Sequence, residues 1–444
     1  MKFSSFFLMA LMALSPSLLC AQRSEQDLTH GWRFHQGAAE GAESPDFNDQ
    51  NWQSVNVPHD WAITGPFSRD HDLQKVAVTQ NFETEASVKT GRTGGLPYVG
   101  EGWYRTSFRS TAGKQVSLVF EGAMSEAKVY VNGKLVIFWP YGYNAFHCDV
   151  TSLLRPNGEA NVLAVHLENK PQSSRWYPGA GLFRHVKVVE TERVHIPVWG
   201  TQVTTPHVAA DYASVCLRTT IEGADTSLLT LKTDIVDENG KTVASKTNRG
   251  YLNHGQPFEQ HLTVERPRLW SPETPHRYRA VTEVSVGGKV TDRYETPFGI
   301  RSIEFVADKG FYLNGERRKF QGVCLHHDLG PLGAAVNRSA IRHQLRMLKD
   351  MGCDAVRTSH NMPAPELVEL CDEMGFMMML EPFDEWDIAK CDNGYHRYFA
   401  EWAERDMVNM LRQFRNHPSV VMWSIGNEVP TQCSSEGYKV ATFL

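Results

Sequence analysis

The sequence predicts a multidomain chain in which two all-β domains precede a parallel α/β domain. Short alternating segments separated by turn residues extend to Phe298, and apolar segments that alternate with amphipathic ones follow. At 444 residues the chain is also too long for one ordinary domain. We expect a jelly roll over residues 22–190, an immunoglobulin-like sandwich over 191–299 and part of a (β/α)8 TIM barrel over 300–444.

Alternation and one hairpin signal predict the first β domain. Asn132-Gly133 lies between two alternating runs, and an Asn-Gly pair favours the positive φ angles of a two-residue hairpin turn. Residues 160–169 alternate as well, so their side chains divide between two faces. Many short strands without a helical period are typical of a sandwich or jelly roll.

A second hairpin signal predicts the second β domain. Leu228–Val236 and Thr242–Ser245 flank Asn239-Gly240, and a proline-rich stretch over residues 266–275 separates the later strands. A length of about 100 residues with this strand spacing suits an immunoglobulin-like sandwich.

Buried strands and amphipathic helices alternate in the third domain, which indicates βαβ units and a parallel sheet. A complete barrel needs about 250 residues, and a partial one leaves two unpaired sheet edges. We therefore expect the chain to be a fragment, a truncated product or half of a split protein. The expected strands are Lys319–Val323, Ala355–Arg357, Phe376–Leu380 and Ser419–Ile425.

The N-terminus has the features of an export signal. The apolar run Phe6–Leu14 follows a positively charged start and is too short to span a bilayer. Cleavage after Ala21 would make residues 1–21 a signal peptide and place the protein in the periplasm or outside the cell. Lipid anchoring at Cys20 is less favoured, because Leu19 occupies a position where lipobox sequences carry a small residue.

Composition excludes several partners. The net charge of −6 argues against nucleic acid, because phosphate binding needs a clustered positive field. No segment predicts a membrane span. The cysteines that would remain after cleavage have no metal-ligand spacing, so we expect buried free thiols and not a disulfide framework.

Each predicted strand of the third domain ends in polar residues. The active site of a parallel barrel gathers at the carboxyl ends of its strands, so we expect these tips to form one site. Glu428 directly follows a buried run, where a carboxyl can serve as a general acid. A glutamate that caps a helix or pairs with a cation is the alternative interpretation. The other tip residues are His326, His327, Asp328, Arg357, His360, Asn361, Glu381, Asp384, Glu385, Trp386 and Asn427.

Four segments resemble glycoside hydrolase family 2, in the order of that family's domains. Residues 174–184 resemble the end of the family's sugar-binding domain, and residues 299–326 resemble the start of its barrel. Residues 356–361 resemble its second-strand motif, and Trp423–Glu428 resembles its acid/base signature. The resemblance implies a sugar-binding jelly roll and a retaining β-glycosidase.

By this resemblance Glu428 is the acid/base residue, and Asn427 binds the sugar 2-hydroxyl. It also implies that Arg357 lies under the nucleophile. The other residues that it assigns to sugar contacts are His326, His360, Asn361, Asp384, Glu385 and Trp386, with Trp386 as a stacking platform.

Two features depart from the family pattern. Cys324-Leu325 replaces an Asn-Arg pair in the first motif. The family's nucleophilic glutamate comes from a later strand than this chain contains. Glu381 is the one internal carboxylate to consider as a substitute, at a position that the family does not use for this role.

Within the family, β-galactosidase is favoured by the export signal, by Asn361-Met-Pro and by the Phe383–Trp386 tip. β-Glucuronidase, β-mannosidase and an inactive carbohydrate-binding protein are the alternatives. The resemblance requires no cofactor, although Mg²⁺ or Na⁺ near the site is compatible with it, and we predict no specific metal ligand. The expected partners are a glycoside or oligosaccharide, with a homo-oligomer or a separate C-terminal half left open.

Overall fold

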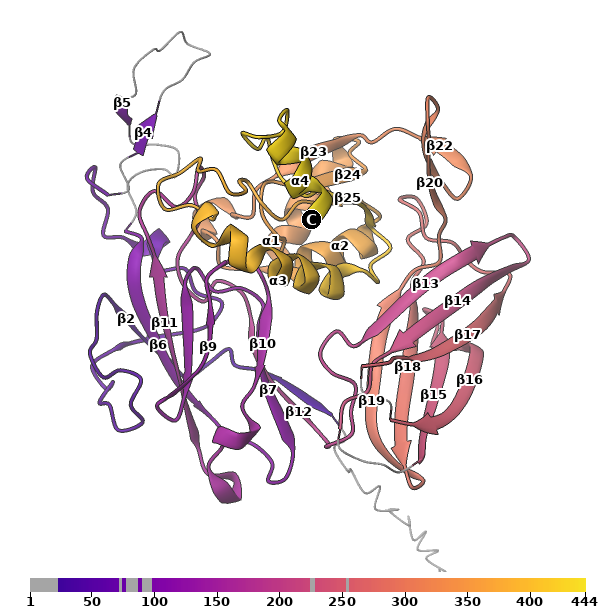
Figure 1. The fold of residues 1–444 in the computed structure, drawn as a ribbon, viewed down its shortest axis with the longest axis horizontal. Coiled ribbons are helices and arrows are strands. Elements are labelled where there is room, and N and C mark those ends of the chain that lie inside the picture. The colour runs from indigo at the N-terminus through magenta and orange to yellow at the C-terminus, as the bar shows by residue number, and fades with distance from the viewer. Residues whose placement is uncertain (1–22, 72–73, 77–86, 90–97, 224–227, 253–254) are drawn as a thin grey trace, which may run out of the picture.

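The structure is a computed structural model that describes residues 23–71, 74–76, 87–89, 98–223, 228–252 and 255–444. The predicted signal peptide and Cys20 lie outside the described residues. Two β-sandwiches and an α/β domain follow one another along the chain, and the α/β domain lies against both sandwiches (Figure 1). The predicted fold class is confirmed.

Two antiparallel sheets form the first sandwich, in the orders β1-β12-β7-β10 and β3-β2-β6-β11-β8-β9. The Asn132-Gly133 hairpin is confirmed, since both residues have positive φ angles, of 51° and 83°. The strands are β1 Ser24–Asp27, β2 Trp32–Gln36, β3 Gln53–Val55, β6 Gly100–Phe108, β7 Gln115–Phe120, β8 Ala127–Val131, β9 Lys134–Trp139, β10 Phe146–Asp149, β11 Asn161–Asn169 and β12 Val186–Thr191, with the separate hairpin β4 Gln74–Val76 and β5 Ser87–Lys89.

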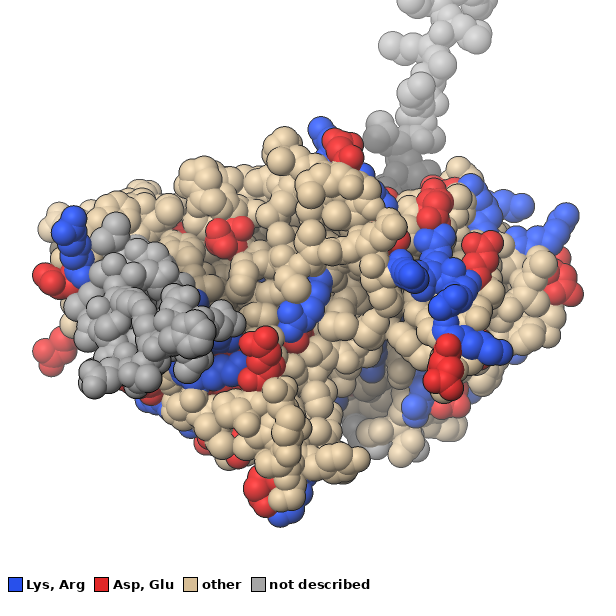
Figure 2. All heavy atoms as spheres, turned by 90° about the horizontal axis from the view of Figure 1, so that it is seen from above, with Lys and Arg blue, Asp and Glu red and all other residues tan. Residues whose placement is uncertain are grey.

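The second sandwich pairs β13-β14-β17 against β16-β15-β18-β19. Its predicted hairpin is present with a longer turn, in which Gly240 but not Asn239 has a positive φ angle. Seen from above, the right side of the molecule carries interspersed acidic and basic side chains (Figure 2). The strands are β13 Thr201–Val208, β14 Tyr212–Thr219, β15 Leu228–Val236, β16 Thr242–Tyr251, β17 Phe258–Glu265, β18 Tyr278–Val286 and β19 Lys289–Phe298.

Four parallel strands in the order β23-β24-β25-β26 form the sheet of the third domain. The antiparallel strands β20 Ile303–Val306, β21 Gly310–Leu313 and β22 Glu316–Arg318 precede them. The parallel strands are β23 Gly322–Leu325, β24 Ala355–Thr358, β25 Met377–Leu380 and β26 Val420–Trp423. The helices are α1 Arg338–Asp350, α2 Pro365–Met374, α3 His396–Phe414 and α4 Ser435–Phe443, with short 3-10 turns at Ala62–Thr64, Thr151–Leu153, Pro156–Gly158 and Gly330–Leu332.

The first parallel strand differs from the prediction of Lys319–Val323. Residues 319–321 form a connection, and β23 begins at Gly322, where the backbone of Ala355 leaves no room for a side chain. The amide of Gln321 donates to the Asp354 side chain at 2.8 Å instead of joining the sheet. The helix α4 was not predicted.

Buried polar contacts attach the first sandwich to the α/β domain. The buried guanidinium of Arg184 donates to the carbonyl oxygen of Tyr143 at 2.7 Å within the sandwich. It also donates to the carbonyl oxygens of Met362 and Pro363 in the connection between β24 and α2, at 2.8 and 3.0 Å. Burial lowers the pKa of Arg184 to about 10.

A second buried contact joins α3 to the same sandwich. The carboxyl of Asp406 accepts hydrogen bonds from Trp139 Nε1 at 3.1 Å, from Asn144 Nδ2 at 2.7 Å and from the Tyr395 hydroxyl. Asp406 is fully buried, and burial raises the pKa of its carboxyl to about 7. The sandwich is therefore part of the scaffold that holds the barrel strands in place.

Cysteines 148, 216, 324, 353, 371, 391 and 433 are free, which agrees with the prediction. They are less buried than expected, because only Cys148 and Cys371 lie in the core, while Cys324 and Cys433 are exposed. Among the described residues, no helix combines the length and the apolar character needed to cross a bilayer.

Candidate active site

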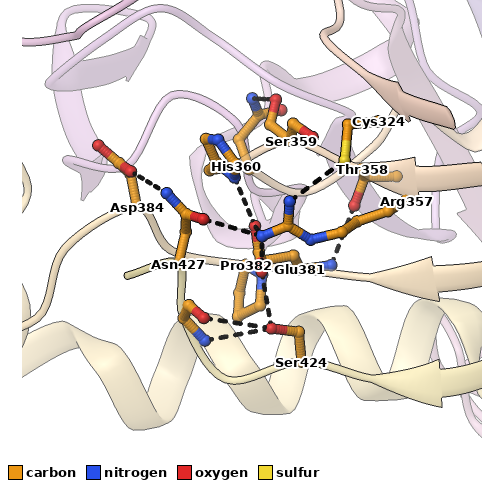
Figure 3. Close-up of polar contacts among 12 residues, drawn as sticks. Cys324, Arg357, Thr358, Ser359, His360, Glu381, Pro382, Asp384, Ser424 and Asn427 are labelled. Carbon is orange, nitrogen blue, oxygen red and sulfur yellow. Dashed lines mark hydrogen bonds and ion pairs between the residues drawn. The ribbon is translucent and has the colours of Figure 1, made fainter. Parts of the chain in front are cut away.

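The carboxyl ends of β24, β25 and β26 meet at one edge of the parallel sheet (Figure 3). Glu381 directly follows β25 and is 1% exposed. Arg357 Nη2 lies 2.9 and 2.8 Å from its two oxygens. His360 Nδ1 lies 2.7 Å from Oε1, and Ser424 Oγ donates to Oε2 at 2.8 Å. The carboxylate thus holds residues from two neighbouring strand ends.

These contacts define the place of Glu381, the internal candidate for a substitute nucleophile. Its oxygens are buried and already accept hydrogen bonds from three side chains. A nucleophile needs an oxygen that can reach the sugar. The geometry instead makes Glu381 the anchor of Arg357 and His360.

A second chain of contacts runs from Arg357 into the first sandwich. Arg357 Nη2 donates to Asn427 Oδ1 at 2.9 Å, and Asn427 Nδ2 donates to Asp384 Oδ1 at 2.9 Å. Arg175, from the sandwich, binds both oxygens of Asp384 at 2.7 and 2.5 Å. Burial would raise the pKa of the Asp384 carboxyl, but hydrogen bonds from Arg175 lower it below its usual value.

Lys390 completes this network from the connection between β25 and α3. Its ammonium donates to the carbonyl oxygen of Asn427 at 2.6 Å and lies 3.2 Å from Asp384 Oδ1. Asp384 is therefore surrounded by donors from three segments. Its carboxylate holds these segments together, whereas the sequence predicts it as a sugar contact.

Aromatic rings form the adjoining wall of the site. The ring of Trp176, from the sandwich, lies 5.2 Å from His326 and 5.7 Å from His360 between centroids, and the two histidines are 5.5 Å apart. Trp176 Nε1 donates to the Tyr143 hydroxyl at 3.0 Å. Burial, followed by the charge of His360, lowers the pKa of His326. The structure therefore brings His326 and His360 together.

Glu428 differs from these residues because its side chain is exposed. It follows the buried Asn427 and has a positive φ angle of 42°. Its carboxylate receives no hydrogen bond or ion pair from the described residues. The side chain is thus available to a ligand at the edge of the network.

Trp386 lies elsewhere than predicted. The indole is 4% exposed, donates to the carbonyl oxygen of Ile425 at 2.8 Å and packs near Phe399. A sugar needs an open ring face, so the prediction of a stacking platform at Trp386 is wrong. The half-buried Trp176 is the tryptophan beside the two histidines.

Two other predicted contacts are also enclosed. Asn361 is buried, and its amide donates to the carbonyl oxygen of Ser359 at 3.2 Å. Glu385 is buried and accepts from the backbone amides of Lys390 and His396 at 2.5 and 2.8 Å. In the structure both side chains hold backbone segments, so neither offers an open sugar contact.

No group of three or more His, Cys, Asp or Glu side chains is arranged to hold a metal ion in the part of the chain that the structure describes. We derive no catalytic step through a metal.

Comparison with protein families gives a match within each of the three domains. "Glycosyl hydrolase 2 galactose-binding domain-like" matches residues 95–185, and "Glycosyl hydrolases family 2" matches residues 194–301. "Glycosyl hydrolases family 2, TIM barrel domain" matches residues 305–443. The chain belongs to glycoside hydrolase family 2.

This family 2 chain is 43% identical over 430 residues to beta-galactosidase BoGH2A of Bacteroides ovatus. The alignment covers 95% of this chain and 48% of that protein. The chain is 33% identical over 425 residues to a putative beta-glucuronidase of Formosa agariphila, with 94% and 38% covered. A crystal structure of a family 2 member from Bacteroides cellulosilyticus matches with a TM-score of 0.87 at 35% identity, over 94% of this chain and 53% of that one. The chain spans about half the length of the curated relatives that it matches.

Three residues of the family 2 site were not selected from the sequence. Arg175 and Trp176 lie inside the segment that resembles the end of the sugar-binding domain, so that segment was the available signal. Lys390 has no local signal, because its place depends on the path of the connection before α3.

Proposed function

We propose that the protein is a retaining β-glycosidase in which Glu428 is the acid/base residue and a β-galactoside is the substrate. The observation that carries the proposal is the contrast at the end of β26. Asn427 is buried in a network of hydrogen bonds, whereas the adjacent Glu428 carboxylate is exposed and unpaired among the described residues.

In this proposal Glu428 protonates the glycosidic oxygen as the bond breaks and later takes a proton from the attacking water. Asn427 supports the same step. An amide nitrogen has two protons, and Asn427 Nδ2 uses one of them on Asp384. The second proton is available for the sugar 2-hydroxyl, where a hydrogen bond strengthens in the transition state.

A retaining mechanism also needs a nucleophilic carboxylate about 5 Å from the acid/base residue. Glu381 and Asp384 are both held by cations and other donors, so we assign this role to neither. The chain covers about half of its curated relatives. The hydrolysis experiment therefore also determines whether these residues suffice for turnover.

Among the described residues alone, charge pairing favours a neutral sugar over an acidic one. The three cations described at the site are each engaged by a carboxylate, because Arg357 pairs with Glu381, and Arg175 and Lys390 pair with Asp384. A glucuronide carboxylate would have to displace one of these pairs. The 43% identity to a protein named beta-galactosidase supports the same choice.

β-Glucuronidase is the second candidate, because relatives at 33% and 27% identity are named as putative or actual beta-glucuronidases. A carbohydrate-binding role without catalysis is the third, since Trp176 comes from the sandwich and lies on the wall of the site. Export from the cytoplasm, proposed from the N-terminal sequence, is compatible with each candidate.

The test is hydrolysis of 4-nitrophenyl β-galactoside, β-glucuronide and β-mannoside by wild-type protein, Glu428→Gln and Glu436→Gln. Glu436 is an exposed glutamate on α4 and serves as the matched control. Where galactoside turnover is observed, we expect Glu436→Gln to match wild type, Glu428→Gln to lose roughly 100-fold or more, and the product to retain its configuration by NMR. Preference for the glucuronide would overturn the sugar assignment. Sugar binding without turnover would favour the carbohydrate-binding role.

A further inference from the structure

The connection between β25 and α3 is folded around one buried carboxylate. Glu385 accepts hydrogen bonds from the backbone amides of Lys390 at 2.5 Å, Cys391 at 3.3 Å and His396 at 2.8 Å. The Asn393 side chain attaches the same connection to the sandwich through the carbonyl oxygen of Pro171, at 2.8 Å. The connection therefore has a defined path, which directs Lys390 towards the end of β26.

Lys390 reaches the peptide that joins Asn427 to Glu428. Its side chain is 12% exposed, and its ammonium donates to the Asn427 carbonyl oxygen at 2.6 Å. Burial lowers the pKa of the Lys390 ammonium, while the charges of Asp384 and Glu428 act in the opposite direction. The ammonium is thus held at the peptide that leads into Glu428.

The backbone of Glu428 needs such support. Its φ angle of 42° lies in the left-handed region, which is sterically disfavoured for residues other than glycine. The amide of Asn427 is fixed by the Phe383 carbonyl oxygen at 2.9 Å. The Asn427 carbonyl, which belongs to the peptide leading into Glu428, is fixed by Lys390.

We propose that Lys390 is a positioning residue for Glu428. By holding the Asn427 carbonyl it keeps the Glu428 backbone in the left-handed conformation, and this conformation turns the carboxylate out of the buried network towards the substrate. The catalytic part of this inference rests on the proposed acid/base role of Glu428.

An alternative role for Lys390, limited to its ion pair with Asp384, explains the contacts of its ammonium less well. Asp384 already receives two hydrogen bonds from Arg175 at 2.7 and 2.5 Å. The Lys390 ammonium lies 3.2 Å from Asp384 but 2.6 Å from the Asn427 carbonyl oxygen. A role as a cation for the substrate is also disfavoured, because the side chain is largely enclosed.

Acid catalysis gives this proposal a specific readout. A poor leaving group needs a well-directed proton donor, whereas a good one departs with little help. Misdirecting Glu428 should therefore slow hydrolysis of a phenyl β-galactoside more than that of a 2,4-dinitrophenyl β-galactoside. Damage to the fold or to sugar binding would slow both substrates alike.

The variants are Lys390→Met, which removes the hydrogen bond, and Lys390→Arg, which can restore a donor. Lys439→Met, an exposed change on α4, is the control. We expect Lys390→Met to lose about tenfold more activity on the phenyl substrate than on the dinitrophenyl substrate. We expect Lys390→Arg to recover part of this loss and Lys439→Met to match wild type. An equal loss on both substrates would overturn the proposal.

Amide hydrogen exchange decides the positioning role without any turnover. We expect the Asn427 amide to exchange about tenfold faster in Lys390→Met than in wild type, while amides of the second sandwich stay unchanged. An unchanged Asn427 amide would refute the positioning role even if the protein is active. If the wild-type protein hydrolyses no glycoside, these residues do not suffice for turnover, and the exchange measurement still decides the role of Lys390.

Discussion

Arg357 Nη2 lies 2.9 and 2.8 Å from the two carboxylate oxygens of Glu381. Glu381 is buried at the end of β25, and Arg357 belongs to β24. The same nitrogen of Arg357 also donates to Asn427, which follows β26. One ion pair therefore sets the spacing of three strand ends and fixes the residue before Glu428.

Replacing Glu381 with Gln should destabilise the protein and its site together. The amide would leave the Arg357 charge without a counterion and would place N–H groups against existing donors. Breaking a buried pair on one side costs about 3–5 kcal/mol, and activity should fall with it. Denaturant unfolding measures the free energy, with the exposed Glu436→Gln as the control. A Glu381→Gln protein within about 0.5 kcal/mol of wild type would contradict this role.

The two tryptophans near the site should respond differently to substitution. Trp176→Ala removes a half-buried ring beside His326 and His360, so sugar affinity should fall roughly tenfold with little loss of stability. Trp386→Phe removes the hydrogen bond to Ile425 in the core, so stability should fall by about 1 kcal/mol while affinity stays unchanged. Calorimetric titration with galactose and thermal unfolding separate the two effects. The reverse pattern would restore Trp386 as the sugar platform.

The buried carboxyl of Asp406 should make stability depend on pH. Burial raises its pKa from 3.8 to about 7, so the folded state holds this proton more tightly than the unfolded state. The protonated Asp406 carboxyl contributes fully to the stability of the folded state below about pH 4, and this contribution is lost as the pH rises through about 7. Between those limits the free energy of unfolding should fall by up to roughly 4 kcal/mol.

Asp406→Asn provides the control for this prediction. Asparagine keeps an oxygen acceptor for Trp139 and Asn144 but has no proton to release. Partner carboxylates raise the pKa of His185 and His417 against the effect of burial. Loss of the proton from these two histidines therefore also lowers the stability of the protein as the pH rises. Only the difference between the two proteins therefore reports on Asp406. If the free energy of unfolding changed with pH in the same way for wild type and Asp406→Asn between pH 4 and 8, the prediction would be contradicted.

Arg184 should be essential for docking of the sandwich on the α/β domain. Arg184→Met would leave the buried carbonyl oxygens of Tyr143, Met362 and Pro363 without their donor. The expected loss is at least about 3 kcal/mol. Arg184→Lys should restore little, because one ammonium cannot reproduce the planar fork of a guanidinium. Chemical unfolding and limited proteolysis measure these effects. An Arg184→Met protein as stable as wild type would rule out this docking role of Arg184.

Much of the fold and part of the site could be predicted because their signals are local. Buried parallel strands produce continuous apolar runs, and their carboxyl ends lie on one edge. That rule brings Arg357, Glu381 and Asn427 together, as the structure shows. The start of β23 was placed wrongly, because the close packing of Gly322 on Ala355 is a tertiary contact.

The remaining site depends on contacts between distant segments. Arg175 and Asp384 are 209 residues apart, and only the docking of the sandwich pairs them. Lys390 reaches Asn427 because Glu385 folds the connection around itself. Trp386 is predicted as a stacking platform, because the sequence around it gives no signal for its burial beside Phe399 of α3.

The proposed acid/base role of Glu428 is tested most directly by azide rescue. Glu428→Ala should cleave 2,4-dinitrophenyl β-galactoside slowly, because the good leaving group needs no proton but the second step lacks a base. Added azide should restore turnover and yield β-galactosyl azide of retained configuration by NMR. An acid/base role of Glu428 predicts this product from Glu428→Ala and none from wild type. Turnover by Glu428→Ala at the wild-type rate, or no rescue by azide, would contradict it.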